Sequence, residues 1–416
     1  MMQASKESRT RNDRVLALLL AAMIVASLLL LTAARPAAAL AGDTLAWGDN
    51  DSGQLGDGTY DPTNTPVKVS NLGNVRTVRA GFDHSLALKE DGTVWAWGYN
   101  GAGQLGNGTF DDSTTPVEVK TASGATLGSV KAIAVGSEFN LALKSNGTVW
   151  AWGYNGDGQL GNGTFDGTNV PMKVSNLSGI KAIAAGEYHS LALKEDGMVR
   201  TWGANGDGQL GNGTFDDSTT PVEVKTASGA ALSSVKAIAV GGNHSLAVKM
   251  DGTVRTWGDN FNGQLGNGTN DDRNVPVKVK TASGTTLGGI KAVAGGEYHS
   301  LALKEDGTVL AWGNNFNGQL GNGSSGLDSD SNVPVQVSNL SGVKAIAAGY
   351  AHSLALKEDG TVRTWGANGA GQLGNGSSGL DSDSNVPVRV KTASGTTLSG
   401  IKAIAAGYAH SLAVKQ

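Results

Sequence analysis

Short apolar segments alternate with glycine-rich and polar segments along almost the whole chain. Between residues 180 and 224, four segments have the character of strands: 180–184, 189–194, 199–202 and 221–224. Clusters of Gly, Asn and Asp separate them, and such clusters are turn signals. Four antiparallel strands in about 50 residues make up one β-propeller blade. The pattern therefore predicts a blade rather than a helical repeat.

The same pattern recurs seven times. Each unit contains Gly-x-x-His-Ser-Leu-Ala, Asp-Gly-Thr-Val, Trp-Gly, Gly-Gln-Leu-Gly and Pro-Val segments, or close variants of them. The Trp-Gly pairs begin at Trp47, Trp97, Trp152, Trp202, Trp257, Trp312 and Trp365. Because recurrence of one pattern every 50 to 55 residues is typical of repeat architectures, we predict an all-β, seven-bladed propeller of four-stranded antiparallel blades. We expect its tryptophans to pack between blades.

The two ends of the repeat region complement each other. The chain ends at Gln416 in the middle of a unit, and the segment 41–48 supplies the strand that this unit lacks. We therefore expect the N- and C-terminal strands to share one blade and close the ring, with the join between Gly42 and Gln416. Closure removes unpaired sheet edges. The chain has no cysteine, so disulfides do not contribute to closure.

The motifs Trp-Gly-x-Asn-x-x-Gly-Gln-Leu-Gly and Gly-x-x-His-Ser-Leu-Ala-Leu resemble the repeats of the regulator of chromosome condensation family, over essentially all of residues 42–416. The resemblance implies a seven-bladed propeller with mixed-strand closure, and it brings nucleotide exchange on a small nuclear GTPase into consideration. The chain is also similar in fold, repeat and apparent export to secreted propeller-type β-lactamase-inhibitory proteins. That similarity implies inhibition of a secreted enzyme.

The first 41 residues differ from the repeats. Basic residues precede an apolar run over 15–31, and Ala39-Leu40-Ala41 fits a small-x-small cleavage site. We predict a signal peptide over 1–41 and the propeller over 42–416, with a secreted or cell-surface location reached by bacterial-type export. An uncleaved anchor is the alternative, because the apolar run is near the short end for a membrane span. The membrane is a partner only in that case.

Residues 42–416 carry 27 basic and 34 acidic side chains, a net charge of -7. An acidic surface argues against nucleic acid, since neutralisation of phosphates supplies most of that affinity. Predicted export argues against nucleotide exchange, and the near-identical blades leave no inserted wedge of the kind that this activity needs. The absence of cysteine removes thiolate metal sites.

Six histidines share one repeat position, and Phe139 occupies the seventh: His84, His189, His244, His299, His352 and His410. An active site needs different groups placed asymmetrically around one reacting atom. A ring of equivalent histidines does not supply this, so we predict no enzyme, no catalytic residue and no cofactor. We expect these histidines to bond backbone atoms at the start of the second strand. A pH-sensitive or metal-binding rim is the alternative.

Two other motifs invite a chemical interpretation. Gly-Gln-Leu-Gly-Asn-Gly lacks the Lys-Ser/Thr ending and following helix of a phosphate-binding loop, and Asn-Gly is ordinary turn chemistry. The loops that begin at Asp328 and Asp381 have calcium-like oxygen spacing but lack the Gly and the bidentate Glu of a calcium loop. Polar solvated loops are therefore the default, and we predict no metal site.

Aromatic and acidic residues gather in the loops between the first and second strands and in those after Trp-Gly. If the strands alternate in direction, these loops share one face. Aromatic residues are enriched at binding hot spots, and loops on rigid scaffolds often carry function. The expected binding residues are Phe82, Asp83, Tyr99, Tyr154, Glu187, Tyr188, Phe261, Glu297, Tyr298, Phe316, Tyr350 and Tyr408.

These features together predict an exported, monomeric binding or scaffold propeller that recognises an extracellular protein or glycan through an aromatic-acidic face. Two alternatives remain at this point, an inhibitor of a secreted enzyme and a cell-surface adhesion or structural protein.

Overall fold

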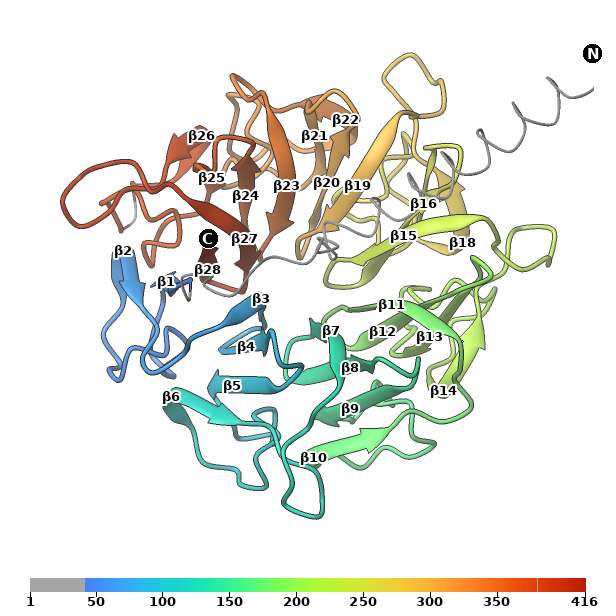
Figure 1. Cartoon of the computed structure of the whole chain (residues 1–416). Coiled ribbons are helices and arrows are strands. Elements are labelled where there is room, and N and C mark those ends of the chain that lie inside the picture. The colour runs from blue at the N-terminus through green and yellow to red at the C-terminus, as the bar shows by residue number, and fades with distance from the viewer. Residues whose placement is uncertain (1–41, 380) are drawn as a thin grey trace, which may run out of the picture. The chain divides into compact units, whose positions relative to one another are not determined.

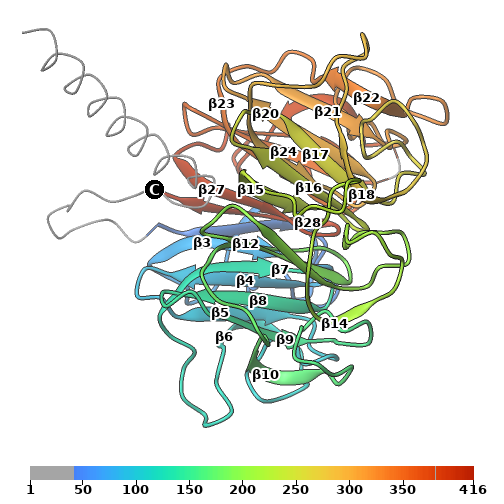
Figure 2. The ribbon, with the colours of Figure 1, turned by 90° about the vertical axis from the view of Figure 1, so that its right-hand side faces the viewer.

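The computed structural model describes residues 42–379 and 381–416. This part of the chain forms 28 strands in seven four-stranded antiparallel sheets, arranged as blades around a central axis (Figure 1). From the side, the strands run across the thickness of the ring (Figure 2). The predicted seven-bladed propeller is confirmed. The predicted signal segment, residues 1–41, lies outside the described residues.

Each blade has the same strand order from the axis outward. The innermost strands are β3 (Val75–Ala80), β7 (Val130–Val135), β11 (Ile180–Ala185), β15 (Val235–Val240), β19 (Ile290–Gly295), β23 (Val343–Ala348) and β27 (Ile401–Ala406). The second strands are β4 (His84–Lys89), β8 (Phe139–Lys144), β12 (His189–Lys194), β16 (His244–Lys249), β20 (His299–Lys304), β24 (His352–Lys357) and β28 (His410–Lys415). The third strands are β1 (Thr44–Gly48), β5 (Val94–Gly98), β9 (Val149–Gly153), β13 (Val199–Gly203), β17 (Val254–Gly258), β21 (Val309–Gly313) and β25 (Val362–Gly366). The outermost strands are β2 (Thr63–Lys68), β6 (Ser113–Glu118), β10 (Thr168–Lys173), β14 (Ser218–Glu223), β18 (Arg273–Lys278), β22 (Ser331–Gln336) and β26 (Ser384–Arg389).

The outermost strands begin earlier than the sequence predicts. In the blade β11–β14, Thr201 pairs with Val222, and the register then shifts so that Gly203 pairs with Ser218. The extra residues form an irregularity of the β-bulge type, which lets one strand carry residues that have no direct partner. A periodicity of two does not reveal residues in such a bulge, so the prediction began this strand at Pro221.

The ring closes where the sequence predicts. Strand β1 inserts between β2 and β28 in the sheet β2-β1-β28-β27, with Thr44 opposite Val414 and Gly48 opposite His410. The backbone N–H of Lys415 also donates to the carbonyl of Asp43 at 2.9 Å. Both chain ends of the propeller are therefore held by backbone hydrogen bonds within one blade, and no sheet edge faces an open seam.

Apolar side chains fill the spaces between neighbouring blades. One such cluster joins Leu301 and Leu303 of β20 to Ala355 and Trp365 of the next blade, all with at most 1% exposure. Each fully buried large apolar side chain contributes about 1.5–3 kcal/mol by leaving water. The predicted packing of the Trp-Gly tryptophans between blades is confirmed.

One main-chain carbonyl per blade receives two donors from the following blade, an arrangement that we call the blade latch. Trp312 Nε1 and Ser300 Oγ both donate to the carbonyl of Gln264, at 2.8 and 2.9 Å. The same carbonyl serves in every blade, at Gln54, Gln104, Gln159, Gln209, Gln264, Gln319 and Gln372. In the blade that contains Phe139, Asn140 Nδ2 replaces the serine and donates to the carbonyl of Gln104.

The glycine that ends Gly-Gln-Leu-Gly is required by this packing. Gly266 has a φ of +64°, and a Cβ there would lie 2.7 Å from Trp312 Nε1. A side chain would therefore displace the indole from its latch, and the positive φ independently favours glycine. The last glycine of the motif is therefore needed for packing against the tryptophan of the next blade.

The histidines differ from the expectation. Their Nε2 atoms contact side chains of the next blade, as His244 contacts Ser300 Oγ at 2.8 Å, rather than backbone atoms. Because the serine hydroxyl donates to the latch carbonyl, it accepts from histidine, which fixes the neutral tautomer with the proton on Nε2. All six side chains are fully buried, so they form no rim. The start of the second strand lies against the neighbouring blade, which sequence spacing alone does not show.

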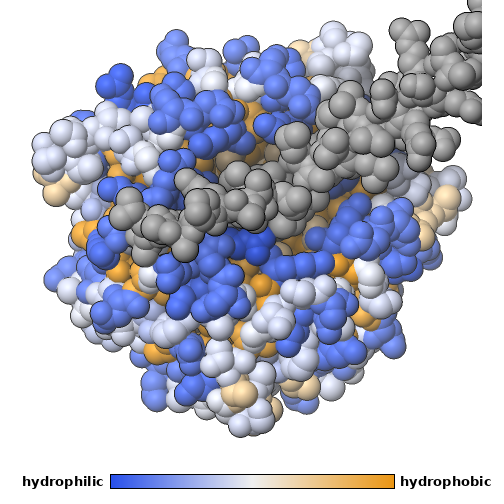
Figure 3. Space-filling model, in the orientation of Figure 1, coloured by the Kyte–Doolittle hydropathy of each residue, from blue (hydrophilic) through white to orange (hydrophobic). Residues whose placement is uncertain are grey.

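Hydrophilic side chains cover most of the face visible in Figure 3 outside the grey atoms, and hydrophobic residues show between them. Over residues 42–379 and 381–416, no helix has the length and apolar character needed to cross a membrane.

Replacing Trp257 by Phe should lower the free energy of unfolding by about 1–3 kcal/mol, because the carbonyl of Gln209 loses one of its two donors and the core loses volume. The matched control is Trp150→Phe, whose Nε1 has no hydrogen-bond partner. Chemical denaturation of the full chain measures both. Equal losses for the two variants would show that the latch bond contributes nothing.

Burial lowers the pKa of His244 from 6.5 to about 3. Since the unfolded chain binds a proton below pH 6.5 and the folded chain does not, this residue stabilises the fold above pH 6.5 and loses that contribution on acidification. At pH 4.5 the neutral, buried His244 should lower the free energy of unfolding by about 2–3 kcal/mol relative to its value above pH 6.5. The variant His244→Phe places at this position the residue that Phe139 already provides in another blade. As pH falls from 6.5 to 4.5, its melting temperature should rise relative to that of the wild type. A difference in melting temperature that stays constant with pH would contradict this.

Candidate functional site

Two kinds of loop share one side of the propeller, which we call the loop face. They are the short turns between first and second strands and the long loops between third and fourth strands. The backbone N–H of Tyr99 in a long loop donates to the carbonyl of Asp83 in a short turn at 2.8 Å. On the opposite face, the backbone N–H of Val130, where an interblade connection enters β7, donates to the carbonyl of Gly92 in a hairpin turn at 3.0 Å. The expected division of loops between two faces is confirmed.

The loop face has an extreme charge composition. Its short turns carry four acidic residues and its long loops carry 18, and none of these loops contains Lys or Arg. All 27 basic residues of the propeller, with the remaining 12 acidic ones, lie in the strands or on the opposite face. Charge is therefore distributed unequally between the two faces of the propeller, which the net charge of -7 alone does not show.

Buried amides hold the long loops in place. Asn205 Nδ2 donates to the carbonyls of Thr214 and Asp216, and its Oδ1 accepts from the N–H of Leu210 at 2.9 Å. Asp217 Oδ1 accepts from the N–H of Asn205 at 2.7 Å. Because these bonds tie both ends of the loop to one buried residue, the loop presents its remaining carboxylates on a fixed frame.

The same bonds account for the calcium-like spacing. Asp330 Oδ1 accepts from the N–H of Asn315 at 2.7 Å, and Asp383 Oδ1 accepts from that of Asn368 at 2.8 Å, as Asp217 does in its blade. Asp328 and Asp381 are exposed. Among the described residues, no group of three or more His, Asp or Glu side chains is placed to hold a metal ion.

Seven residues at one repeat position surround the axis on the loop face, and we call them the mouth ring. They are Phe82, Ser137, Glu187, Gly242, Glu297, Tyr350 and Tyr408. Backbone hydrogen bonds link each blade to the next at this level, as Glu187 N–H donates to the carbonyl of Gly242 at 3.0 Å and Tyr408 N–H to that of Gly81 at 3.1 Å. Because backbone atoms make these bonds, the side chains at the seven positions are free to differ.

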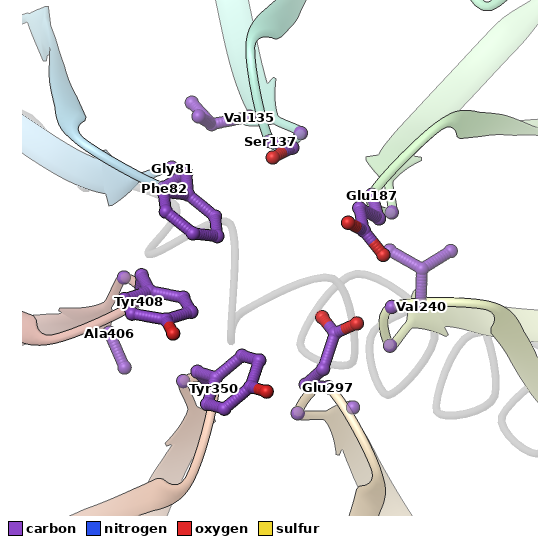
Figure 4. A pocket seen from close by; sticks show the side chains of 18 of the residues that line it. Gly81, Phe82, Val135, Ser137, Glu187, Val240, Glu297, Tyr350, Ala406 and Tyr408 are labelled. Carbon is purple, nitrogen blue, oxygen red and sulfur yellow. The ribbon is translucent and has the colours of Figure 1, made fainter. Parts of the chain in front are cut away.

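Three adjacent members of the mouth ring form an aromatic arc. The rings of Phe82 and Tyr408 stack at 3.9 Å between centroids, and Tyr408 and Tyr350 follow at 4.3 Å. Tyr298 meets Tyr350 edge-on at 5.7 Å. Figure 4 shows Phe82, Tyr408 and Tyr350 together on one side of the hollow.

Glu187, Gly242 and Glu297 form the opposite, acidic arc. Both carboxylates point towards the axis and towards each other (Figure 4). Burial, and then the charge of Glu187, hold the pKa of Glu297 well above its usual range. A Cβ on Gly242 would lie within 2.4 Å of the Glu297 carboxylate carbon, so the missing side chain makes room for that carboxylate.

The structure divides the twelve predicted binding residues into groups. Phe82, Glu187, Glu297, Tyr298, Tyr350 and Tyr408 come together at or beside the mouth ring. Tyr154 and Tyr188 form a separate edge-on pair at 6.1 Å. Burial, followed by the charge of Asp49, raises the pKa of Asp83 to about 6.

The remaining predicted aromatic residues do not join the mouth ring. Phe261 and Phe316 stay at loop tips, 81% and 54% exposed. The ring of Tyr99 lies over Gly101 of its own loop. Sequence position alone does not distinguish these tips from the axis, because both belong to loops on the same face.

The sequence prediction missed Ser137 and Gly242. Both follow the glycine that ends an innermost strand, so the repeat register contains the signal, but neither residue is aromatic or acidic. Gly242 matters because of what it does not contribute, namely a side chain that would displace Glu297.

Comparison with known proteins agrees with this architecture. A family model described as the RCC1-like domain matches residues 43–413. The ultraviolet-B receptor UVR8 of Arabidopsis thaliana is 35% identical over 350 residues, which cover 83% of this chain and 78% of the receptor. The E3 ubiquitin-protein ligase HERC2 of Mus musculus is 33% identical over 380 residues, 89% of this chain but 8% of the ligase. Yeast RCC1 (Prp20) superposes with a TM-score of 0.77 at 26% identity, over 90% of this chain and 89% of that one.

These relatives overturn the predicted function. An exported propeller that recognises an extracellular protein or glycan, or that inhibits a secreted enzyme, has no support among them. Nucleotide exchange, against which the apparent export argued, is not excluded, because yeast RCC1 itself matches nine-tenths of the chain. The family model begins at residue 43, after the N-terminal segment that suggested export.

Glu297→Gln should stabilise the propeller increasingly as pH rises. A raised native pKa means that the carboxyl stabilises the fold at low pH and loses this contribution as pH rises from 4.5 through the native pKa. At pH 7.5 the variant should gain about 1–2 kcal/mol. Thermal melts between pH 4.5 and 8 test this, with Glu195→Gln on the opposite face as the control. A gain that is absent at pH 7.5 would show that the native pKa of Glu297 is not raised.

Proposed function

The chain belongs to the RCC1-like domain family, and on that premise we propose that it is a protein-docking propeller whose loop face holds a strongly basic protein partner. The observation that carries the proposal is the charge separation, with 22 acidic and no basic residues in the loops of one face. The proposal concerns the repeat domain and involves neither export nor a glycan.

Electrostatics supports a partner of this charge. A surface of one sign attracts an oppositely charged partner over distances comparable with the Debye length, about 8–10 Å at physiological salt, and it raises association rates. It also disfavours acidic partners and nucleic acid, because like charges would be brought together. Since the loops are fixed by buried amides such as Asn205, little ordering of the face would accompany docking.

The relatives support docking of proteins by this fold. Yeast RCC1 (Prp20) is known in a complex with Kap60, and Prp20p has been studied for its binding to Gsp1p and histones. Those partners belong to the yeast protein. For the present chain they support the coarser idea that the propeller acts by binding other proteins.

Catalysis is not part of the proposal. The ubiquitin ligase HERC2 matches over only 8% of its own length, so its activity does not carry over to this chain. The mouth ring presents two carboxylates and aromatic rings but no His, Ser-His or metal arrangement suited to bond cleavage. Nucleotide exchange breaks no covalent bond and needs no such catalytic groups. The binding experiment below therefore also measures nucleotide release from a small GTPase.

Four exposed aspartates at equivalent positions of the long loops provide the decisive variant. Asp61, Asp111, Asp166 and Asp216 are exposed, and no side-chain hydrogen bond of theirs holds the loop. Changing all four to Asn should weaken binding of a fluorescent Lys/Arg-rich peptide to the full chain about tenfold or more at low salt. Fluorescence anisotropy measures the affinity, and added salt should weaken the wild type more steeply than the variant.

The matched control removes four charges from the opposite face, with Glu90, Glu195, Glu305 and Glu358 changed to Gln. It should change peptide affinity less than about twofold. Equal effects of the two variants, or peptide binding that ignores salt, would refute docking on the loop face. Accelerated nucleotide release from a small GTPase, retained in the Asp-to-Asn variant, would instead assign exchange to another surface.

A further inference from the structure

We infer that the mouth ring is a binding pocket for a single alkylammonium group, of the kind that ends a lysine or methyl-lysine side chain. The group would lie on the axis between the aromatic arc and the acidic arc. The inference rests on the proposed function in one respect, that a basic partner would supply the group. The pocket itself is argued from the mouth ring alone.

The aromatic arc offers the first half of such a site. Phe82, Tyr408 and Tyr350 come from three adjacent blades, and their rings follow one another along one wall of the hollow (Figure 4). The face of an aromatic ring carries negative potential and attracts organic cations, and aromatic cages are the usual site for methylated ammonium groups. An apolar ligand would satisfy this wall but not the side opposite to it.

The acidic arc supplies the second half. Glu187 and Glu297 approach each other across the space left by Gly242, and no salt bridge to either carboxylate occurs in the described residues. The loops of this face contain no Lys or Arg that could pair with them. Two converging carboxylates without a counter-charge are unfavourable, and an external cation would relieve their repulsion.

The lining of the hollow favours one kind of cation. Small residues that directly follow the inner strands also line it, among them Gly81, Gly186 and Gly296. Hydrocarbon surface on one side and carboxylates on the other favour an organic cation over a bare metal ion, which would need several oxygen ligands. Only two carboxylates converge here, and the ring supplies no third.

Proton release provides an independent signature. The carboxyl of Glu297 faces Glu187, with Asp259 and the hydroxyl of Tyr298 nearby, and burial raises its pKa. Burial also raises the pKa values of Tyr298 and Tyr408, so these two hydroxyls do not supply the proton. At neutral pH the carboxyl pair therefore retains a proton that an arriving ammonium group would displace, so binding should tighten as pH rises.

The test uses the full chain and small probes rather than a protein partner. Titration calorimetry with butyltrimethylammonium and butylammonium should show binding in the millimolar range, while neutral butanol and calcium ions should show none. Titration in two buffers with different ionisation enthalpies should reveal release of a proton. Binding of calcium but not of the organic cations would overturn the inference, as would equal binding of butanol.

Two variants and a matched control locate the pocket. Glu297→Gln removes one charge, and Gly242→Ala adds a Cβ where the Glu297 carboxylate lies, at a backbone conformation that alanine tolerates. Each should weaken butyltrimethylammonium about tenfold. Glu138→Gln neutralises an acid in a turn of the same type that does not line the hollow, and it should leave the affinity unchanged. Thermal melts confirm that each variant is folded.

The outcomes separate this inference from the proposed function. Peptide docking that is lost in the four-aspartate variant but unaffected by Gly242→Ala and Glu297→Gln, with no binding of the small cations, would leave docking intact and refute the pocket. Small-cation binding without peptide docking would support the pocket and refute the docking face.

Discussion

The rest of the propeller depends on the hydrogen bonds that the main-chain carbonyl of the Gln in Gly-Gln-Leu-Gly accepts from the following blade. This carbonyl receives an indole N–H and, in six blades, a serine hydroxyl from the following blade, and the serine in turn accepts from a histidine in five of these contacts. A buried carbonyl with two donors is costly to leave unpaired. Tryptophan position, the adjoining glycine and the neutral histidine tautomer therefore depend on one another, which explains why these residues recur together around the ring.

Because the blade latch holds neighbouring blades together, the side chains of the mouth ring are not needed for that role. Its interblade bonds use backbone atoms, and the side chains at this one repeat position can therefore differ, from the hydrogen of Gly242 to the ring of Tyr408. Seven copies of one position can then place different chemistry around a single axis. Identical repeats would give a ring of identical groups, whereas here aromatic and acidic residues occupy opposite arcs.

Charge separation follows from a similar division of labour. Lysines and arginines lie in or beside strands, where long side chains cover apolar surface, as Lys144 does over Trp150. Aspartates occupy the long loops, where Asp217 and its equivalents bond backbone N–H groups. Because neighbouring strands run in opposite directions, all the long loops lie on one face of the propeller. Aspartates that serve each loop locally therefore gather on that face, and together they give it a negative electrostatic potential.

The sequence by itself determined the seven blades, their strand order and the closure of β1 against β28, because apolar periodicity and turn residues act locally and repeat. It also determined which residues lie on the loop face. Only the tertiary structure decided that Glu187 and Glu297 converge across Gly242 while Phe261 and Phe316 remain at exposed tips. It likewise decided that His244 contacts Ser300 instead of backbone. These contacts join different blades, and their geometry depends on how the ring brings separate repeats together, which no spacing within one repeat specifies.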